Sequence, residues 1–217
     1  GPGVYAKKTS DLTRQWPEGT VTTPLNYMQA YEGEARYILG EYDTAYRLFS
    51  QALEITSIFK GLYIIPEIYY YMTLSMAALY SSSTESDKEM FASAMTEHRD
   101  FLKILSGQCP ENFKHKYLAM DAEISRILGN GLDTMALYDR AIEAARTFGF
   151  TQDEAIANEL AGKFWLDLGK ADFAGIYLLK AREAYKKWGA ERKVRDLESR
   201  YGDILMERRV PGIGRRN

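Results

Sequence analysis

The chain has 217 residues, of which 46% are hydrophobic and 27% are charged, and its formal net charge is −2. This composition excludes intrinsic disorder, and the near-neutral charge gives no overall preference for nucleic acid or membrane surfaces. The single cysteine, Cys109, excludes an internal disulfide, and two histidines are too few for the usual Cys/His zinc site. We therefore expect a globular domain that holds no metal and no cofactor.

No uninterrupted apolar run approaches the ~18 residues of a membrane-spanning helix. The most apolar segment, 61–80, is interrupted by Pro66 and Glu67 and predicts a buried helix. The N-terminus lacks the apolar region of a secretory signal. Together with the lone cysteine, these features predict a cytoplasmic location without a membrane span.

Helical signals dominate the chain, and strand signals are nearly absent. Pro24, Pro66 and Pro110 each stand at the start of an apolar-periodic segment, where proline suits the first helical turn. Thr151 followed by Glu154 matches a capping box. The sequence therefore predicts an all-α fold. The expected helices lie near 24–39, 41–59, 65–80, 85–105, 110–128, 132–147, 152–168, 171–188 and 190–206.

The ends of the chain differ from its centre. Residues 1–23 are interpreted as a cloning remnant followed by an N-terminal linker. Residues 24–206 are expected to form one helical array. Residues 207–217, which are rich in arginine and glycine, are expected to begin a linker to a further domain.

Glycines and large residues recur 40 residues apart: Gly129 recurs as Gly169, and Tyr138 recurs as Leu178. Such a period indicates stacked helical hairpins, because no single hairpin can bury its whole apolar face. A small residue in one helix allows a large neighbour from the other to approach closely. The positions expected to pack the hairpins are Gly33, Gly40, Ala45, Phe49, Ala52, Tyr138, Ala141, Gly162, Trp165, Gly169, Ala174 and Ala181.

These positions resemble the tetratricopeptide motif, both from Gly33 to Ala52 and from Gly162 to Ala181. The middle hairpin departs from the motif, since Thr134 stands where a small alanine is expected and Gly131 where an aromatic is expected. The resemblance implies an irregular tetratricopeptide-like α-α superhelix of about nine helices with a period near 40. In such an array the helix near 85–105 is interpreted as an insertion that breaks the period.

A second resemblance rests on three runs: CPENFKHKYLAMDAEISRILGN, LYDRAIEAARTFGFTQDEAIANELAGKFWLDLGK and YLLKAREAYKKWGAERKVRDLESRYGDIL. They are similar to the helical region of large bacterial multidomain signalling proteins. Those proteins place a Ser/Thr kinase-like domain and an AAA-type ATPase before this region, and GAF and histidine-kinase modules after it; related fungal hybrid histidine kinases share the layout. The resemblance covers roughly Pro24 to Leu205 and implies a coupling or sensing role between an ATPase and a kinase output.

Motifs for catalysis are absent from the sequence. It contains neither a G-x-x-x-x-G-K-[ST] phosphate loop nor a G-x-G-x-x-G turn between a strand and a helix. His98 and His115 are interpreted as surface histidines on polar helix faces. Cys109, before Pro110, is interpreted as a packing residue at a helix start. We expect the chain to have no catalytic residues, although the resemblance implies that its parent protein is an ATP-dependent kinase.

Two surfaces are candidates for binding a partner. The tyrosine-rich segment can either pack between helices or line the concave groove of the array, where tyrosine suits a surface that is partly buried and partly wet. The stretch from Lys180 to Asn217 holds 12 Lys/Arg against 6 Asp/Glu, but four-residue spacings such as Asp196/Arg200 indicate ion pairs within a solvated helix. The groove candidates are Tyr63, Tyr69, Tyr70, Tyr71 and Tyr80, and the basic-surface candidates are Lys186, Lys187, Arg192 and Lys193.

These observations favour a regulatory domain that binds protein, either another part of the same chain or a signalling partner. The alternative is a sensor domain that binds a small-molecule inducer in the groove. Nucleic acid is not expected as a partner, because the basic residues of the last helix alternate with acids. Homodimerisation is left open by the sequence.

Overall fold

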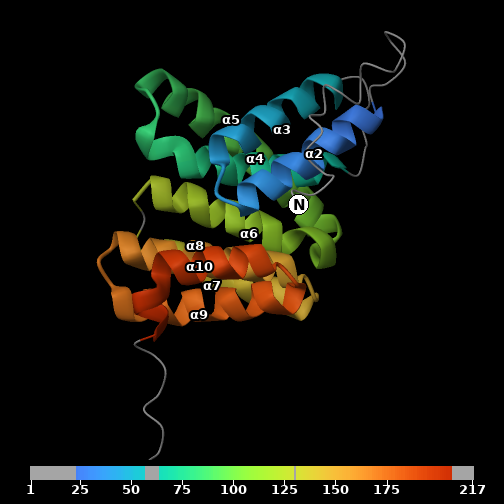
Figure 1. Ribbon diagram of the computed structural model, residues 1–217. Coiled ribbons are helices and arrows are strands. Elements are labelled where there is room, and N and C mark those ends of the chain that lie inside the picture. Colours follow the sequence, from blue (N-terminus) through green and yellow to red (C-terminus); the bar gives the residue numbers. More distant parts are fainter. Residues whose placement is uncertain (1–22, 57–63, 130, 207–217) are drawn as a thin grey trace, which may run out of the picture. The chain divides into compact units, whose positions relative to one another are not determined.

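The computed structural model describes residues 23–56, 64–129 and 131–206, and every element in this part of the chain is helical (Figure 1). The all-α prediction is therefore confirmed, and the helices begin and end close to the expected positions. The elements are α2 (Thr23–Ile38), α3 (Tyr42–Thr56), α4 (Ile64–Leu79), the short 3-10 helix η1 (Tyr80–Ser82), α5 (Glu85–Gln108), α6 (Pro110–Ile127), α7 (Leu132–Thr147), α8 (Thr151–Asp167), α9 (Ala171–Trp188) and α10 (Glu191–Met206).

The chain divides into two compact units, Gly1–Arg99 and Asp100–Asn217, which we call unit 1 and unit 2. The division falls inside α5, the longest helix. The linkers predicted for 1–23 and 207–217 lie outside the described residues, apart from Thr23 at the start of α2. Each unit buries a core of its own.

Unit 1 is built on the hairpin of α2 and α3, with α4 packed against both helices. Gly33 lies directly against the ring of Phe49, so that a Cβ atom placed on Gly33 would be 2.8 Å from Phe49 Cε1. Tyr71 of α4 stacks on Phe49, with the centres of the two rings 6.2 Å apart. The predicted contact of a small residue with a large one thus forms the core of the unit.

Unit 2 contains two further hairpins, α6–α7 and α8–α9, and α10 packs against α9. Gly162 of α8 repeats the role of Gly33, because a Cβ atom there would be 2.7 Å from Leu178 Cγ. Trp165 is half-buried and stacks on Phe173. The remaining helix-packing positions are each 0% exposed: Ala45, Ala52, Tyr138, Ala141, Ala174 and Ala181.

The turns between the paired helices rely on glycine. Gly40 follows α2 with a φ of 82°, and Gly169 follows α8 with a φ of 69°. These values lie in the left-handed region, which costs glycine little because it has no Cβ atom. In the middle hairpin, Thr134 replaces the expected alanine, and its hydroxyl group is hydrogen-bonded to that of Ser125 at 2.8 Å in the core. The polar substitution is accommodated because a second hydroxyl satisfies it.

The predicted capping box at Thr151 is wrong. Helix α8 begins at Thr151 itself, its N-cap residue is Phe150, and no side chain caps it. Such a cap is found instead before α5, where Thr84 Oγ1 accepts a hydrogen bond from the backbone N–H of Asp87 at 3.2 Å and donates one to the Asp87 carboxylate at 2.7 Å. Glu154 instead forms an ion pair with Arg146 of α7 at 2.9 Å.

Candidate interaction site

The tyrosine-rich segment is mainly a core element. Tyr70 and Tyr71 are 0% and 2% exposed, so neither can line a groove as the sequence suggested. Their rings lie edge to face, 4.9 Å apart, and Tyr71 also packs against Tyr37 and Phe49 of the first hairpin. Tyr69 and Tyr80 are half-buried, and Tyr63 lies outside the described residues.

Three of the four basic-surface candidates are exposed, namely Lys186, Lys187 and Arg192. The fourth, Lys193, is only 4% exposed and points inward, where its Nζ donates to Glu159 Oε1 at 2.9 Å. The prediction for Lys193 is therefore wrong, because a buried carboxylate holds the ammonium group. The expected pair of Asp196 and Arg200 is present at 2.8 Å.

Both histidines are buried, in contrast to the surface positions that the sequence predicted. His98 of α5 stacks on Tyr69 with ring centroids 4.1 Å apart, and its Nδ1 is 3.2 Å from Thr73 Oγ1. Burial lowers the pKa of His98 to about 4, so this ring is neutral at physiological pH. His115 of α6 is 1% exposed and lies 3.0 Å from the carboxylate of Asp153.

Asp153 is one of three buried carboxylates in the described part of unit 2, and it connects α8 to α6. Its Oδ2 accepts hydrogen bonds from His115 and from Lys116 Nζ, the latter at 3.1 Å. Burial, the largest effect, would raise the pKa of Asp153, but the charges and hydrogen bonds of Lys116 and His115 together outweigh it and lower the pKa to about 2. The carboxylate is thus fixed in its charged form.

Glu123 and Glu159 make the same kind of connection elsewhere in the unit. Glu123 of α6 accepts a hydrogen bond from the Tyr138 hydroxyl of α7, and it pairs with Arg126 at 2.7 Å. Glu159 of α8 accepts from the Tyr185 hydroxyl of α9 at 2.8 Å and from Lys193 of α10. Removing one partner of a buried, hydrogen-bonded carboxylate is costly, so these groups hold the connected helices together.

Sequence reasoning missed these three carboxylates. The neighbouring residues of Glu159 could have revealed it. Glu159 is the one charged residue in the run 155–162, whose other members are small or apolar. A lone acid in such a run predicts a buried partner. None of the three clusters is a metal site, since no group of three or more His, Cys, Asp or Glu residues in the described ranges could hold an ion.

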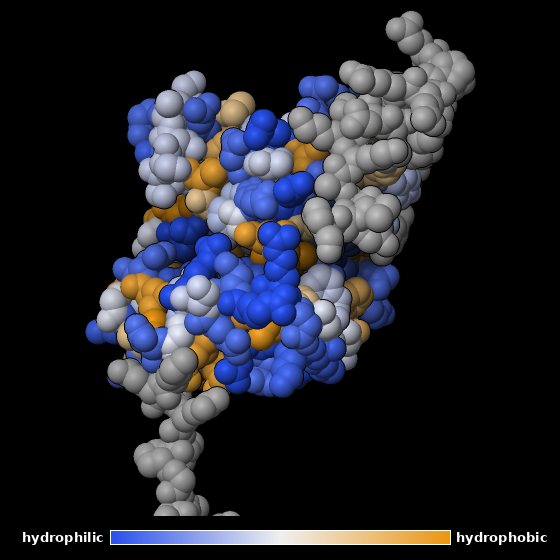
Figure 2. All heavy atoms as spheres, viewed as in Figure 1, coloured by the Kyte–Doolittle hydropathy of each residue, from blue (hydrophilic) through white to orange (hydrophobic). Residues whose placement is uncertain are grey.

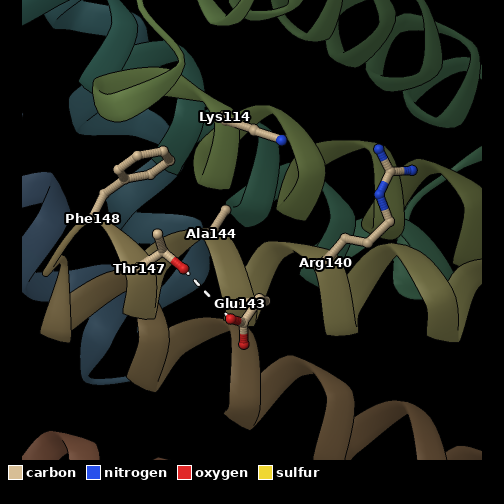
Figure 3. A pocket seen from close by; sticks show the side chains of 6 residues that line it. All are labelled: Lys114, Arg140, Glu143, Ala144, Thr147 and Phe148. Carbon is tan, nitrogen blue, oxygen red and sulfur yellow. Dashed lines mark hydrogen bonds between the residues drawn. The ribbon is translucent and has the colours of Figure 1, made fainter.

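An open cleft on unit 2 is the best candidate for binding a partner. It has a volume of about 220 Å³ and lies between α6 and α7. Lys114 reaches over the cleft from α6, whereas Arg140 stands at one end of the α7 wall and Phe148 at the other (Figure 3). The lining residues are Lys114, Arg140, Glu143, Ala144, Thr147 and Phe148.

The charges of this cleft are unbalanced. Its carboxylate, Glu143, accepts a hydrogen bond from Thr147 Oγ1 at 3.5 Å and lies 3.5 Å from Arg146. Neither Lys114 nor Arg140 has an ion pair or a hydrogen bond with another side chain in the described ranges. Phe148 is 38% exposed and adds an apolar wall. The cleft thus offers two exposed cations beside an aromatic ring.

On the face of unit 2 that Figure 2 shows, hydrophilic residues predominate and hydrophobic residues form separate spots. Leu168, Phe173 and Trp188 are 51%, 51% and 40% exposed, which is common for single apolar residues on a soluble surface. Among the described helices, none is both long enough and apolar enough to cross a bilayer.

Comparison with known proteins relates the chain to signalling proteins. No family model matches it. Over 61 residues, or 28% of the chain, it is 38% identical to the hybrid signal transduction histidine kinase G of Dictyostelium discoideum. The chain spans only 2% of the length of that protein. The likeness supports a signal-transduction context for the helical array.

Proposed function

We propose that this chain is a non-catalytic regulatory domain of a multidomain signalling protein, where it couples an ATPase module to a kinase output through protein–protein contacts. The observation that carries the proposal is the likeness to a hybrid histidine kinase, which falls on a chain built of helical hairpins. We infer that the hairpins are tetratricopeptide-like, since Gly33 and Gly162 occupy the same close-contact position in two of them.

The three buried carboxylates support this proposal over an enzymatic one. Each is engaged by cations or hydroxyl groups of neighbouring helices. A catalytic acid or base must instead reach a substrate. The open cleft beside α7 suits a partner's side chains better than an enclosed ligand, because its volume of about 220 Å³ lies below the ~300–1,000 Å³ of typical small-molecule pockets.

The test uses the full-length product of the gene. Autophosphorylation by ATP would be measured with and without the activating stimulus, in the native protein and in a variant with Lys114→Glu and Arg140→Glu. We expect the response to the stimulus to change while the basal rate of the kinase domain remains. The purified 217-residue chain should not hydrolyse ATP.

The matched control is Lys180→Glu, which reverses an exposed cation 40 residues after Arg140, in the next hairpin. A normal response in both variants would count against the proposal. ATP hydrolysis by the purified chain would contradict its non-catalytic part. Stabilisation of the purified chain by a small metabolite would instead favour the inducer-sensor alternative.

A further inference from the structure

We propose that the cleft between α6 and α7 binds an acidic peptide segment that carries an apolar side chain. This inference rests on the proposed function and names the chemistry of the partner. The cleft consists of Lys114 from α6 and the exposed edge of α7 from Arg140 to Phe148 (Figure 3).

Charge complementarity is the first reason. Lys114 and Arg140 are both exposed, and neither has an ion-pair or hydrogen-bond partner among the described side chains. Glu143, in contrast, pairs with Arg146 and accepts a hydrogen bond from Thr147. A carboxylate that enters the cleft therefore meets two available donors and an acid that is already engaged. Arginine can bind a carboxylate through two parallel hydrogen bonds, which adds direction to the attraction.

The apolar wall is the second reason. Phe148 presents its ring at the end of the cleft, and Ala144, only 7% exposed, forms part of its floor. An apolar side chain of the partner would cover both residues and remove them from water. The volume of the cleft, about 220 Å³, is below the ~300–1,000 Å³ of typical small-molecule pockets. That space suits one or two side chains of a larger partner.

The following hairpin provides an internal comparison. Forty residues later, Lys114 is replaced by Glu154, which pairs with Arg146, whereas Arg140 is replaced by Lys180 and Phe148 by Trp188. The aromatic residue and one cation are thus present in both hairpins, but the second cation is found only in α6. The pair of available cations is a property of this cleft.

A peptide is favoured over nucleic acid because of Glu143. Its side chain is 69% exposed and lies along α7 between Arg140 and the aromatic end, where it would repel a phosphate backbone. A peptide can alternate acidic and apolar side chains to avoid this carboxylate. The formal charge of −2 for the whole chain also gives no general attraction for polyanions.

The probe is a short fluorescein-labelled peptide of aspartate, glutamate and serine with one central leucine, added to the purified 217-residue chain. Binding is followed by fluorescence anisotropy. We expect saturable binding that weakens with added salt, and a loss of affinity of about tenfold in the Lys114→Glu, Arg140→Glu variant. Phe148→Ala should weaken binding of the leucine peptide more than that of a peptide with serine in its place.

Three controls make the result decisive. Lys180→Glu makes the same charge change as Arg140→Glu and should leave the affinity unchanged. An equal loss of affinity in Lys180→Glu and in the double variant would show a nonspecific charge effect and overturn the proposal. Undiminished binding in the Lys114→Glu, Arg140→Glu variant would also overturn the proposal. Tighter binding of a single-stranded oligonucleotide of equal charge would assign the cleft to nucleic acid instead. Unaltered thermal unfolding of each variant excludes misfolding, because all these side chains are exposed.

The two proposals fail in different ways. If the peptide does not bind but the double variant still alters kinase control in the full-length protein, only the acidic-peptide inference is wrong. If the peptide binds at the cleft and control is unaffected, the cleft is a binding site but the regulatory function is not supported.

Discussion

At the scale of single residues, the two glycines that face large side chains govern how closely the paired helices approach. Gly162 is the sharper case, because a Cβ atom there would lie 2.7 Å from Leu178 Cγ and 3.4 Å from the Leu178 backbone nitrogen. Leu178 is 0% exposed and cannot move aside without disturbing the core. We expect Gly162→Ala to lower the free energy of unfolding by about 1–3 kcal/mol, measured by urea denaturation.

Gly107 is the matched control for this substitution. It lies in the last turn of α5, and a Cβ atom there would have no neighbour within 4 Å. Gly107→Ala should therefore raise the free energy of unfolding by about 0.5–1 kcal/mol, because alanine reduces the entropy of the unfolded chain. Destabilisation of equal size at both positions would show that helix–helix contact is not the cause.

Glu159 predicts a pH dependence of stability. Burial, the largest effect, would raise the pKa of Glu159, but the charges and hydrogen bonds of Lys163 and Lys193 together outweigh it and lower the pKa to about 2. A carboxylate with a lowered pKa in the folded state stabilises the protein above its ordinary pKa of about 4.3. That contribution is lost as the pH falls from there towards 2. The free energy of unfolding should therefore decline over this range.

In Glu159→Gln the decline with falling pH should be shallower, and the protein should be less stable at pH 7 by about 3 kcal/mol, because the buried Lys193 loses its hydrogen-bonded carboxylate and keeps only the longer contact with Asp196 at 3.6 Å. Urea denaturation at several pH values measures both effects. Adding Lys193→Met, which removes the stranded charge, should restore part of the lost stability. An unchanged pH profile in Glu159→Gln would mean that other carboxylates, such as Asp153, account for the acid sensitivity.

At the scale of helices, α5 depends on the cap that Thr84 provides. The hydroxyl of Thr84 satisfies the backbone N–H of Asp87, which would otherwise lack a partner in the first turn. Thr84→Ala should lower stability by about 1 kcal/mol, whereas Thr84→Ser should retain most of it. Hydrogen exchange at Asp87 and Lys88 measures the fraying of this turn, and equal protection in both variants would contradict the role of the cap.

The hairpins show why the array tolerates an irregular middle. Ala122 and Tyr138 of α6–α7 occupy the positions that Gly162 and Leu178 hold 40 residues later, and both are fully buried. Thr134 fits between the two helices because Ser125 completes its hydrogen bonding. A large buried residue and a small buried residue thus keep their positions in both hairpins while the identity of each varies.

At the scale of the whole molecule, the two units are expected to respond separately to damage in one core. Tyr70 is 0% exposed in unit 1, so Tyr70→Ala should cost that unit about 3–5 kcal/mol through the cavity that it leaves. Trp165 and Trp188 lie in unit 2 and report its unfolding by fluorescence in a Trp16→Phe background. We expect circular dichroism to show that unit 1 unfolds under milder conditions in this variant. The midpoint of the fluorescence transition, which reports on unit 2, should stay unchanged.

A single transition in which both signals shift together would show that the units unfold as one. The reciprocal change, Leu118→Ala in the core of unit 2, should move the fluorescence midpoint and serves as the positive control. Because Tyr70 is buried, Tyr70→Ala tests stability and cannot report on a binding groove.

The sequence alone determined the helices, the 40-residue spacing and the close-contact glycines. These features depend on neighbours a few residues apart or on a repeated pattern, and a single chain displays both. Tertiary structure decided the rest. Lys193, which the sequence placed on the surface, is buried because Glu159 lies 34 positions earlier on a helix that packs nearby. His115 is buried for the same reason, through Asp153.

The cleft between α6 and α7 was likewise invisible in the sequence, where Lys114 and Arg140 are two charged residues among many. They line one space only because α6 and α7 fold back on each other, and they are available only because other acids pair with other cations. Local periodicity specifies which face of a helix is apolar. The partner of each charge depends on contacts between residues far apart in the chain, which only the packed structure establishes.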